Sequence, residues 1–118
     1  MEDTRFTPPM TNDLLFARDQ HLCMYCGEAF RSKDLSRDHI VPTSRGGKDI
    51  WTNCVTACRR CNNRKGNSLL QETSLELLAV PFAPNRYEFF YLSNKDVLVD
   101  QMEFLKPRFS RYSSHMFQ

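Results

Sequence analysis

Short stretches with strand-like or helix-like periodicity follow one another in the first half of the chain. Residues 13–18 predict a short helix, which Asn12 can cap and which ends near Gln20. Residues 35–41 alternate loosely between apolar and polar side chains and stop at Pro42, which is typical of a short strand. Residues 54–57 are partly β-branched and predict a second strand. The segment 43–49 between them carries two glycines and is expected to be a loop.

Two helices are predicted directly after the second strand. Residues 59–65 form the first, because Gly66 stands in the usual position of a helix stop. The second helix runs from residue 68 to about residue 78 and is closed by Pro81 and Pro84. It would bury the side chains of Leu69, Leu70, Leu75, Leu77 and Leu78.

The chain length of 118 residues fits one compact domain with appended segments. We expect residues 1–11 to be a flexible leader and residues 12–84 to form the domain that carries the chemistry. Residues 85–118 are expected to form a helical and aromatic C-terminal extension, in which Asn94 caps a helix to about Leu105.

Neither a membrane span nor an export signal is predicted. No run of about 18 apolar residues occurs, and the first residues lack the basic head and apolar stretch of a signal peptide. We therefore expect a cytoplasmic protein in a reducing compartment, without a membrane partner.

Four of the five cysteines stand in two C-x-x-C pairs, which are Cys23, Cys26, Cys58 and Cys61. In a reducing compartment such pairs favour a metal over disulfides. A two-residue spacer lets one turn direct both thiolates at an ion about 2.3 Å away, and Gly27 tolerates the positive φ of that turn. Four protein ligands leave no open coordination position, so we predict a structural zinc site. Buried or redox-active cysteines are the alternative, and Cys54 is expected to be a small buried apolar residue.

Positive charge is concentrated in the middle of the chain. Residues 31–66 hold nine basic and three acidic side chains, a net charge of +6. The whole chain carries +2, so the remainder carries −4. Charge separated in this way is typical of a polyanion-binding site, although a solvated basic face would have the same composition.

The two cysteine pairs enclose 31 residues, more than the roughly 15–20 of a simple zinc ribbon. A further unit must therefore fold between them. Asp38 and His39 are neighbours at the end of the first predicted strand, and neighbouring strand residues face opposite sides of a sheet. One of them can thus hold a metal while the other handles a proton.

Four motifs in a fixed order resemble the HNH endonucleases of bacteria and phages. They are C-x-x-C-G from residue 23, D-H-I-V-P-x-S-R-G-G from residue 38, W-x-N from residue 51 and C-x-x-C-N-x-x-K-G from residue 58. The resemblance covers about residues 14–70. It implies an α+β fold: a small ββα-metal core stabilised by the structural four-cysteine zinc site, with flanking helices and the active site between the strands and the helix.

The resemblance also implies roles for four residues. His39 corresponds to the general base that activates water, and Asp38 to the carboxylate that ligates a catalytic metal. Asn53 corresponds to the residue that braces the loop carrying the base. Asn62 occupies the position of the second metal ligand, where the family has His or Asn. Histidine titrates near neutral pH, and an oxygen pair such as Asp38 and Asn62 suits Mg²⁺ or Mn²⁺ better than zinc.

Two positions depart from the family pattern. Asn62 replaces the commoner His, which weakens the affinity for soft metals, and Cys54 stands where a plain aliphatic residue is usual. Neither departure removes a catalytic group.

Double-stranded DNA is the expected partner. The residues expected to contact its phosphates are Arg37, Arg45, Arg64 and Lys65. Trp51 is expected to pack in the core rather than to wedge between bases.

The predicted function is metal-dependent hydrolysis of DNA phosphodiester bonds. Two alternatives stay open at this point. One is a zinc-stabilised module that binds nucleic acid without cutting it, and the other is a subunit of phage packaging or restriction machinery that a protein partner activates. The sequence does not indicate an oligomeric state or a preferred DNA site.

Overall fold

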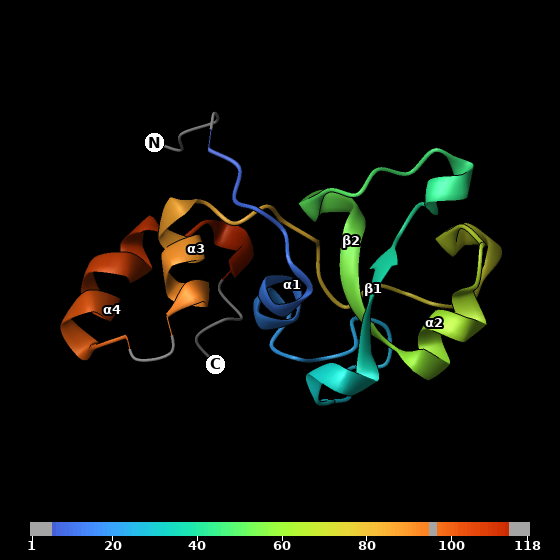
Figure 1. Cartoon of the computed structure of the whole chain (residues 1–118), viewed down its shortest axis with the longest axis horizontal. Helices are drawn as coiled ribbons and strands as arrows, with labels where there is room; N and C mark the ends of the chain where they lie inside the picture. The colour runs from blue at the N-terminus through green and yellow to red at the C-terminus, as the bar shows by residue number, and fades with distance from the viewer. Residues whose placement is uncertain (1–5, 95–96, 114–118) are drawn as a thin grey trace.

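A two-stranded antiparallel sheet lies between helices in the computed structural model, which describes residues 6–94 and 97–113 (Figure 1). Strand β1 (Leu35–His39) pairs with β2 (Cys54–Cys58). Helix α1 (Asn12–Arg18) packs on one face of the sheet, and α2 (Arg59–Lys65), which follows β2 directly, packs on the other. Strand, loop, strand and helix thus form the predicted ββα unit, and the flanking helices complete the predicted α+β fold.

Two further helices lie beyond α1, away from the sheet (Figure 1). They are α3 (Arg86–Ser93) and α4 (Val99–Leu105). Asn85 starts α3 with a capping box: its side chain accepts from the Glu88 N–H, and the Glu88 carboxylate accepts from the Asn85 N–H. No helix of the described residues is long and apolar enough to cross a membrane.

The helix predicted for residues 68–78 is wrong. Only the 3-10 turn η4 (Leu70–Glu72) forms, and the chain then runs without helix to residue 85. Leu75, Leu77 and Ala79 pack against the core around the first cysteine pair, while the residues between them are exposed. This period of two is that of extended chain, and the Leu78 N–H donates to the Met24 carbonyl.

Helix boundaries shift at two other places. Thr11 rather than Asn12 caps α1, because its hydroxyl accepts from the Leu14 N–H. Asn94 ends α3 instead of starting the next helix, and α4 begins only at Val99.

The described part of the expected leader is packed against the domain. Pro8 is buried, and its carbonyl accepts from the Trp51 indole N–H at 3.0 Å. The Met10 carbonyl accepts from the Arg37 guanidinium. Residues 1–5 of the leader lie outside the described residues. Trp51 itself is 3% exposed, which confirms its predicted place in the core.

A buried arginine at the end of α1 connects this helix to β2. Arg18 is fully buried and pairs with Asp19, with 2.9 Å between Nε and Oδ1. Its guanidinium also donates to the carbonyls of Trp51, Cys54 and Phe82. Asp19 in turn accepts from the Thr56 N–H on β2 at 2.9 Å. These bonds explain how two buried charges are tolerated, because each is met by several partners.

Arg18→Met is therefore expected to lower the free energy of unfolding by about 3–5 kcal/mol, because Asp19 would keep a buried charge without its partner. Urea unfolding followed by circular dichroism measures the change. Arg31→Met is the matched control on the surface and should stay within about 0.5 kcal/mol of the parent. Equal effects of the two substitutions would contradict the structural role of Arg18.

Candidate active site and metal centre

The four cysteines of the two C-x-x-C pairs form one cluster, although 31 residues separate the pairs. Their sulfur atoms all lie within 4.8 Å of one another, and the cysteines form no disulfide. Such a set of four thiols fits a tetrahedral zinc site. Each pair comes from a tight turn: Gly27 has φ +78° after the first pair, and the Cys61 N–H donates to the Cys58 sulfur at the start of α2.

Local hydrogen bonds prepare the first sulfur for a metal. Burial raises the pKa of Cys23, but the N–H groups of Cys26 and Cys58 outweigh this effect and lower the pKa to about 7. Burial raises the pKa of Cys61 to about 12. Cys23 thus loses its proton more readily than Cys61, whose proton a bound metal would displace.

The alternation of side chains along β1 divides the expected site residues between two faces of the sheet. Arg37 is opposite Thr56 and His39 is opposite Cys54 in the strand register. Because direct partners share a face, and because Thr56 bonds to Leu15 of α1, this set faces α1. Ser36 and Asp38 face α2.

Asp49 is the hub of the α1 face. Its Oδ1 atom accepts from three side chains: His39 Nε2 at 2.8 Å, Arg37 Nη1 at 3.0 Å and the Cys54 thiol at 3.5 Å. Arg37 also donates to Oδ2 at 3.0 Å. Asp49 comes from the loop between the strands, so this one carboxylate joins the loop to the ends of both strands.

These contacts determine the protonation states around His39. The hydrogen bond from His39 and the Arg37 guanidinium lower the pKa of Asp49 to about 2, so Asp49 is an anion at neutral pH. Burial and the neighbouring Asp49 raise the pKa of Cys54 to about 12, so its thiol stays protonated. A carboxylate can only accept, so in the neutral imidazole of His39 the proton is on Nε2 and the lone pair on Nδ1. Nδ1 makes no hydrogen bond within the described part of the chain, and the His39 side chain is 25% exposed.

Asn53 holds the loop that carries Asp49. Its amide nitrogen donates to the carbonyls of Val41 and Lys48, at 3.1 and 2.8 Å, and its amide oxygen accepts from the Val41 N–H at 3.0 Å. Gly47 lies so close to this bracket that a Cβ atom there would stand 1.7 Å from the Val41 oxygen. The loop is therefore closed around the Asn53 amide, and a side chain at residue 47 would open it.

Asp38 lies on the other face, 5% exposed, between Tyr25 and Lys65. Its Oδ2 atom accepts from the Tyr25 hydroxyl, and its Oδ1 atom is 3.5 Å from the Lys65 ammonium. Burial and Asp38 both raise the pKa of Tyr25, which keeps the hydroxyl a donor. The charge of Asp38 is thus already matched by Lys65.

Asn62 shares the α2 face with Asp38 but contacts a different residue. Its amide donates to the Ser36 hydroxyl at 2.7 Å. His39 leaves the opposite face of the sheet from Asp38, because the two residues are neighbours on β1. Asp38 and Asn62 share a face, and in this arrangement the first is paired with Lys65 and the second with Ser36.

The four basic residues expected to contact DNA have different surroundings. Lys65 is 1% exposed, and its ammonium donates to the His39 carbonyl at 2.8 Å, so it is a buried support of β1 rather than a phosphate contact. Arg37 is engaged by Asp49, and Arg45 forms an ion pair with Glu72. Arg64 is exposed and forms no ion pair among the described residues.

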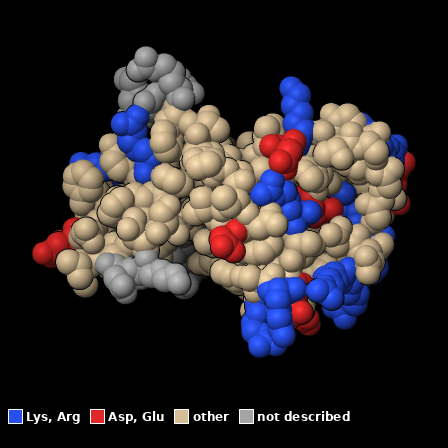
Figure 2. Space-filling model, viewed as in Figure 1, with Lys and Arg blue, Asp and Glu red and all other residues tan. Residues whose placement is uncertain are grey.

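Exposed positive charge gathers at one end of the ββα unit. Figure 2 shows Lys and Arg side chains clustered where the 3-10 turn η1 (Ser32–Asp34) meets the start of α2, whereas the visible surface around α3 and α4 is largely uncharged. The exposed basic residues of these segments are Arg31, Lys33, Arg59 and Arg60. We call this surface the basic end.

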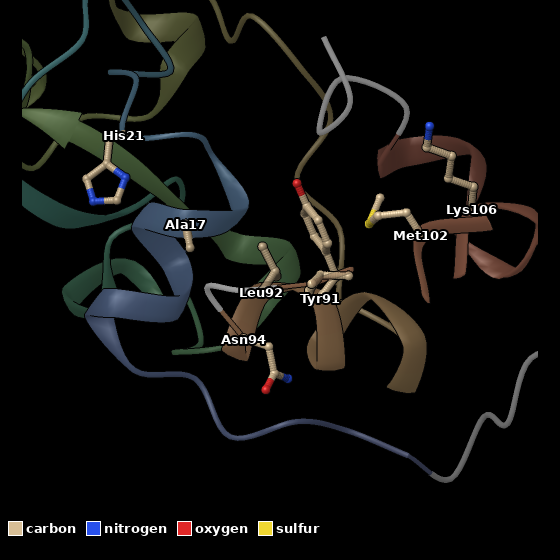
Figure 3. A pocket seen from close by; sticks show the side chains of 8 residues that line it. Ala17, His21, Tyr91, Leu92, Asn94, Met102 and Lys106 are labelled. Carbon is tan, nitrogen blue, oxygen red and sulfur yellow. The ribbon is translucent and has the colours of Figure 1, made fainter. Parts of the chain in front are cut away.

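A hollow of about 560 Å³ lies away from this chemistry, between α1 and the C-terminal helices. Figure 3 shows the side chains that line it, among them His21, Tyr91 and Lys106. None of the described residues that line this hollow carries a carboxylate. Those residues therefore offer no acid and base pair like the one on the α1 face of the sheet.

One residue that the sequence analysis did not assign to the site, Asp49, proves central to its geometry, because it contacts His39 directly. Arg37 and Lys65, which were expected to contact DNA, instead hold Asp49 and the His39 carbonyl of β1. The sequence signal for Asp49 is its position two residues after Gly47, within the loop that Asn53 closes. The contact between His39 and Asp49 joins residues ten positions apart across an irregular loop. Such a contact leaves no periodic pattern in the sequence from which it could be predicted.

Comparison with known proteins supports the identity of this unit. Residues 23–78 match the family model described as HNH endonuclease. The chain is also 30% identical over 95 residues to the CRISPR-associated endonuclease Cas9 of Corynebacterium diphtheriae. That alignment covers 76% of this chain but 9% of the relative, so the chain spans only a small part of that protein.

The motifs in their order, the ββα topology and the four-cysteine cluster agree with the family match. The histidine of the D-H-I-V-P motif, His39, lies at the end of β1. Residues 23–78 thus match the HNH endonuclease family both in sequence and in the ββα topology of their strands and helix.

Proposed function

We propose that this protein is an endonuclease that hydrolyses phosphodiester bonds of DNA, with His39 as the general base. The observation that carries the proposal is the hydrogen bond between His39 and Asp49 on an accessible face of the sheet. A carboxylate on one ring nitrogen orients the imidazole and leaves the other nitrogen to take a proton. The family match adds the reaction class.

In this reaction His39 Nδ1 accepts a proton from water, and the oxygen of that water attacks the phosphorus. The bond between the phosphorus and the 3′ oxygen breaks, and this oxygen leaves and takes up a proton from solvent. Asp49 stabilises the imidazolium that forms, because its negative charge lies 2.8 Å from Nε2. Asn53 acts at a distance by holding the loop on which Asp49 stands. We therefore regard Asp49 and Asn53 as positioning residues.

A divalent cation, Mg²⁺ or Mn²⁺, would neutralise charge on the phosphate and the leaving oxygen. The assignment of Asp38 and Asn62 as its ligands stays a prediction from the family resemblance. The Tyr25 and Lys65 contacts of Asp38 speak against it in the present arrangement.

We propose that the four-cysteine cluster holds Zn²⁺ and has a structural role, since all four positions are filled by protein. It joins the turn before β1 to the start of α2. We assign residues 12–84 to the nuclease domain, because α1 packs on the sheet through Arg18 and Asp19, and residues 85–118 to the C-terminal extension.

Duplex DNA is proposed to reach the site across the basic end. Strand β1 runs from this end to His39, and its five residues place the two about 13 Å apart at about 3.3 Å per residue. Lysine and arginine contacts to phosphates position a duplex without reading its sequence. Arg64 remains a candidate for such a contact, whereas Arg37, Arg45 and Lys65 already have acidic or backbone partners within the fold.

Nicking of supercoiled plasmid with Mg²⁺ or Mn²⁺ tests the nuclease. His39→Ala is expected to lower the rate by about 10²–10⁴-fold, the usual contribution of a general base. His21→Ala, at a histidine whose ring contacts Ser32 and Phe16, is the matched control and should cut normally. Binding of DNA without cleavage by the parent chain would favour the non-catalytic module instead.

The dependence of the cleavage rate on metal concentration distinguishes the roles of Asp49 and Asp38. Asp49→Asn should lower the maximal rate without changing the Mg²⁺ concentration for half-maximal activity, because it acts through His39. Asp38→Asn should raise that concentration if Asp38 holds the cation. An unchanged metal dependence in Asp38→Asn would remove Asp38 from the cation site.

Removal of zinc is expected to unfold the nuclease domain. Structural zinc contributes about 10–16 kcal/mol in small zinc domains, which is as large as the roughly 5–15 kcal/mol by which a whole domain is stable. Thermal unfolding by circular dichroism, before and after dialysis against a chelator and after return of Zn²⁺, measures the effect. An unchanged melting temperature in the chelated protein would refute a structural metal.

A further inference from the structure

Three different metal-ligating atoms meet on the α1 face of the sheet. His39 and Cys54 are direct partners in the β1–β2 register, so both side chains leave the same face at the same level. Asp49 reaches them from the loop between the strands. The imidazole nitrogen, the carboxylate oxygen and the thiol sulfur all lie within 4.8 Å of one another.

Their separations are close to those that one metal ion would impose. The distance from Asp49 Oδ1 is 2.8 Å to His39 Nε2 and 3.5 Å to Cys54 Sγ. Zinc bonds of about 2.0–2.3 Å in a tetrahedron place the ligand atoms roughly 3.2–3.7 Å apart. Small rotations of exposed Asp49 and half-buried His39 are enough to admit an ion.

The chemistry of these ligands selects the class of metal. Nitrogen, oxygen and sulfur donors together suit zinc and similar transition metals, whereas Mg²⁺ prefers oxygen ligands in octahedral geometry. Three protein ligands leave a fourth position for water. The thiol is the specific feature, because Cys54 stands where this resemblance leads us to expect an aliphatic side chain.

We propose that His39, Asp49 and Cys54 form a second metal site that takes Zn²⁺ and inactivates the general base. Bonds form from the ion to Nε2, Oδ1 and Sγ, the thiol proton passes to solvent, and the hydrogen bonds of His39 and Cys54 to Asp49 are broken. With Nε2 on the metal, the imidazole proton must sit on Nδ1, the nitrogen that would otherwise accept the proton of water. Zinc thus reverses the tautomer that catalysis needs.

The site should bind zinc more weakly than the four-cysteine cluster. It has three protein ligands instead of four, and the Arg37 guanidinium donates to both oxygens of Asp49. That positive charge opposes a second cation beside it. Zinc should therefore fill the four-cysteine cluster first and the second site only at higher concentration.

Metal binding to these residues is independent of the proposed function, whereas inhibition rests on it. The test compares the parent chain with Cys54→Val, in which a β-branched residue replaces the thiol on the strand. After dialysis against micromolar Zn²⁺, the parent should hold two zinc ions per chain and Cys54→Val one. In plasmid nicking with Mg²⁺, added Zn²⁺ should slow the parent at least tenfold and leave the rate of Cys54→Val unchanged.

Equal zinc counts in the two proteins would overturn the proposed site. If Cys54→Val fails to fold, Asp49→Asn takes its place, because Asp49 is exposed on a loop. Asp49→Asn should likewise hold one zinc ion per chain. If the parent holds two zinc ions and Cys54→Val one, but neither protein cleaves DNA, the second metal site is supported and the nuclease is refuted. Cleavage that zinc inhibits equally in both proteins, with equal counts, would keep the nuclease and refute the site.

Discussion

The alternation of side chains along a strand of five residues governs the arrangement of this protein. Consecutive residues of β1 must face opposite sides of the sheet, and α1 and α2 cover those two sides. His39 therefore faces α1 and Asp49, while Asp38 faces α2, Tyr25 and Lys65. A shift of the register by one residue would exchange the two environments, and would bury the histidine beside a lysine.

The register is maintained by contacts that lie at both ends of the strands. Asn53 closes the loop with three hydrogen bonds, and the sulfur cluster fixes the opposite end of β2 to the turn before β1. This closed loop places Asp49 beside the ends of both strands. There its Oδ1 atom accepts hydrogen bonds from three side chains. The same proximity to His39 and Cys54 makes Asp49 a ligand in the proposed zinc site.

Much of this fold follows from the sequence where spacing determines geometry. The four cysteines, the two strands, α2 and its stop at Gly66 were predictable, because turns and short elements depend on near neighbours. The helix expected for residues 68–78 is wrong, since a leucine-rich segment that precedes prolines can also satisfy a period of two. The partnership of Asp49 with His39 was not predictable, because it depends on how a loop closes. Burial of Lys65 likewise depends on how α2 packs against β1.

The central claim is that His39, oriented by Asp49, is the group that faces the phosphate to be cut. A crystal structure of the chain with duplex DNA and Ca²⁺ tests it most directly, since Ca²⁺ often occupies cation sites without supporting such hydrolysis. The account predicts a phosphate within reach of His39 Nδ1, directly or through one water, with Asp49 still on Nε2. A duplex bound with its phosphates on another face, and His39 turned away from all of them, would contradict it.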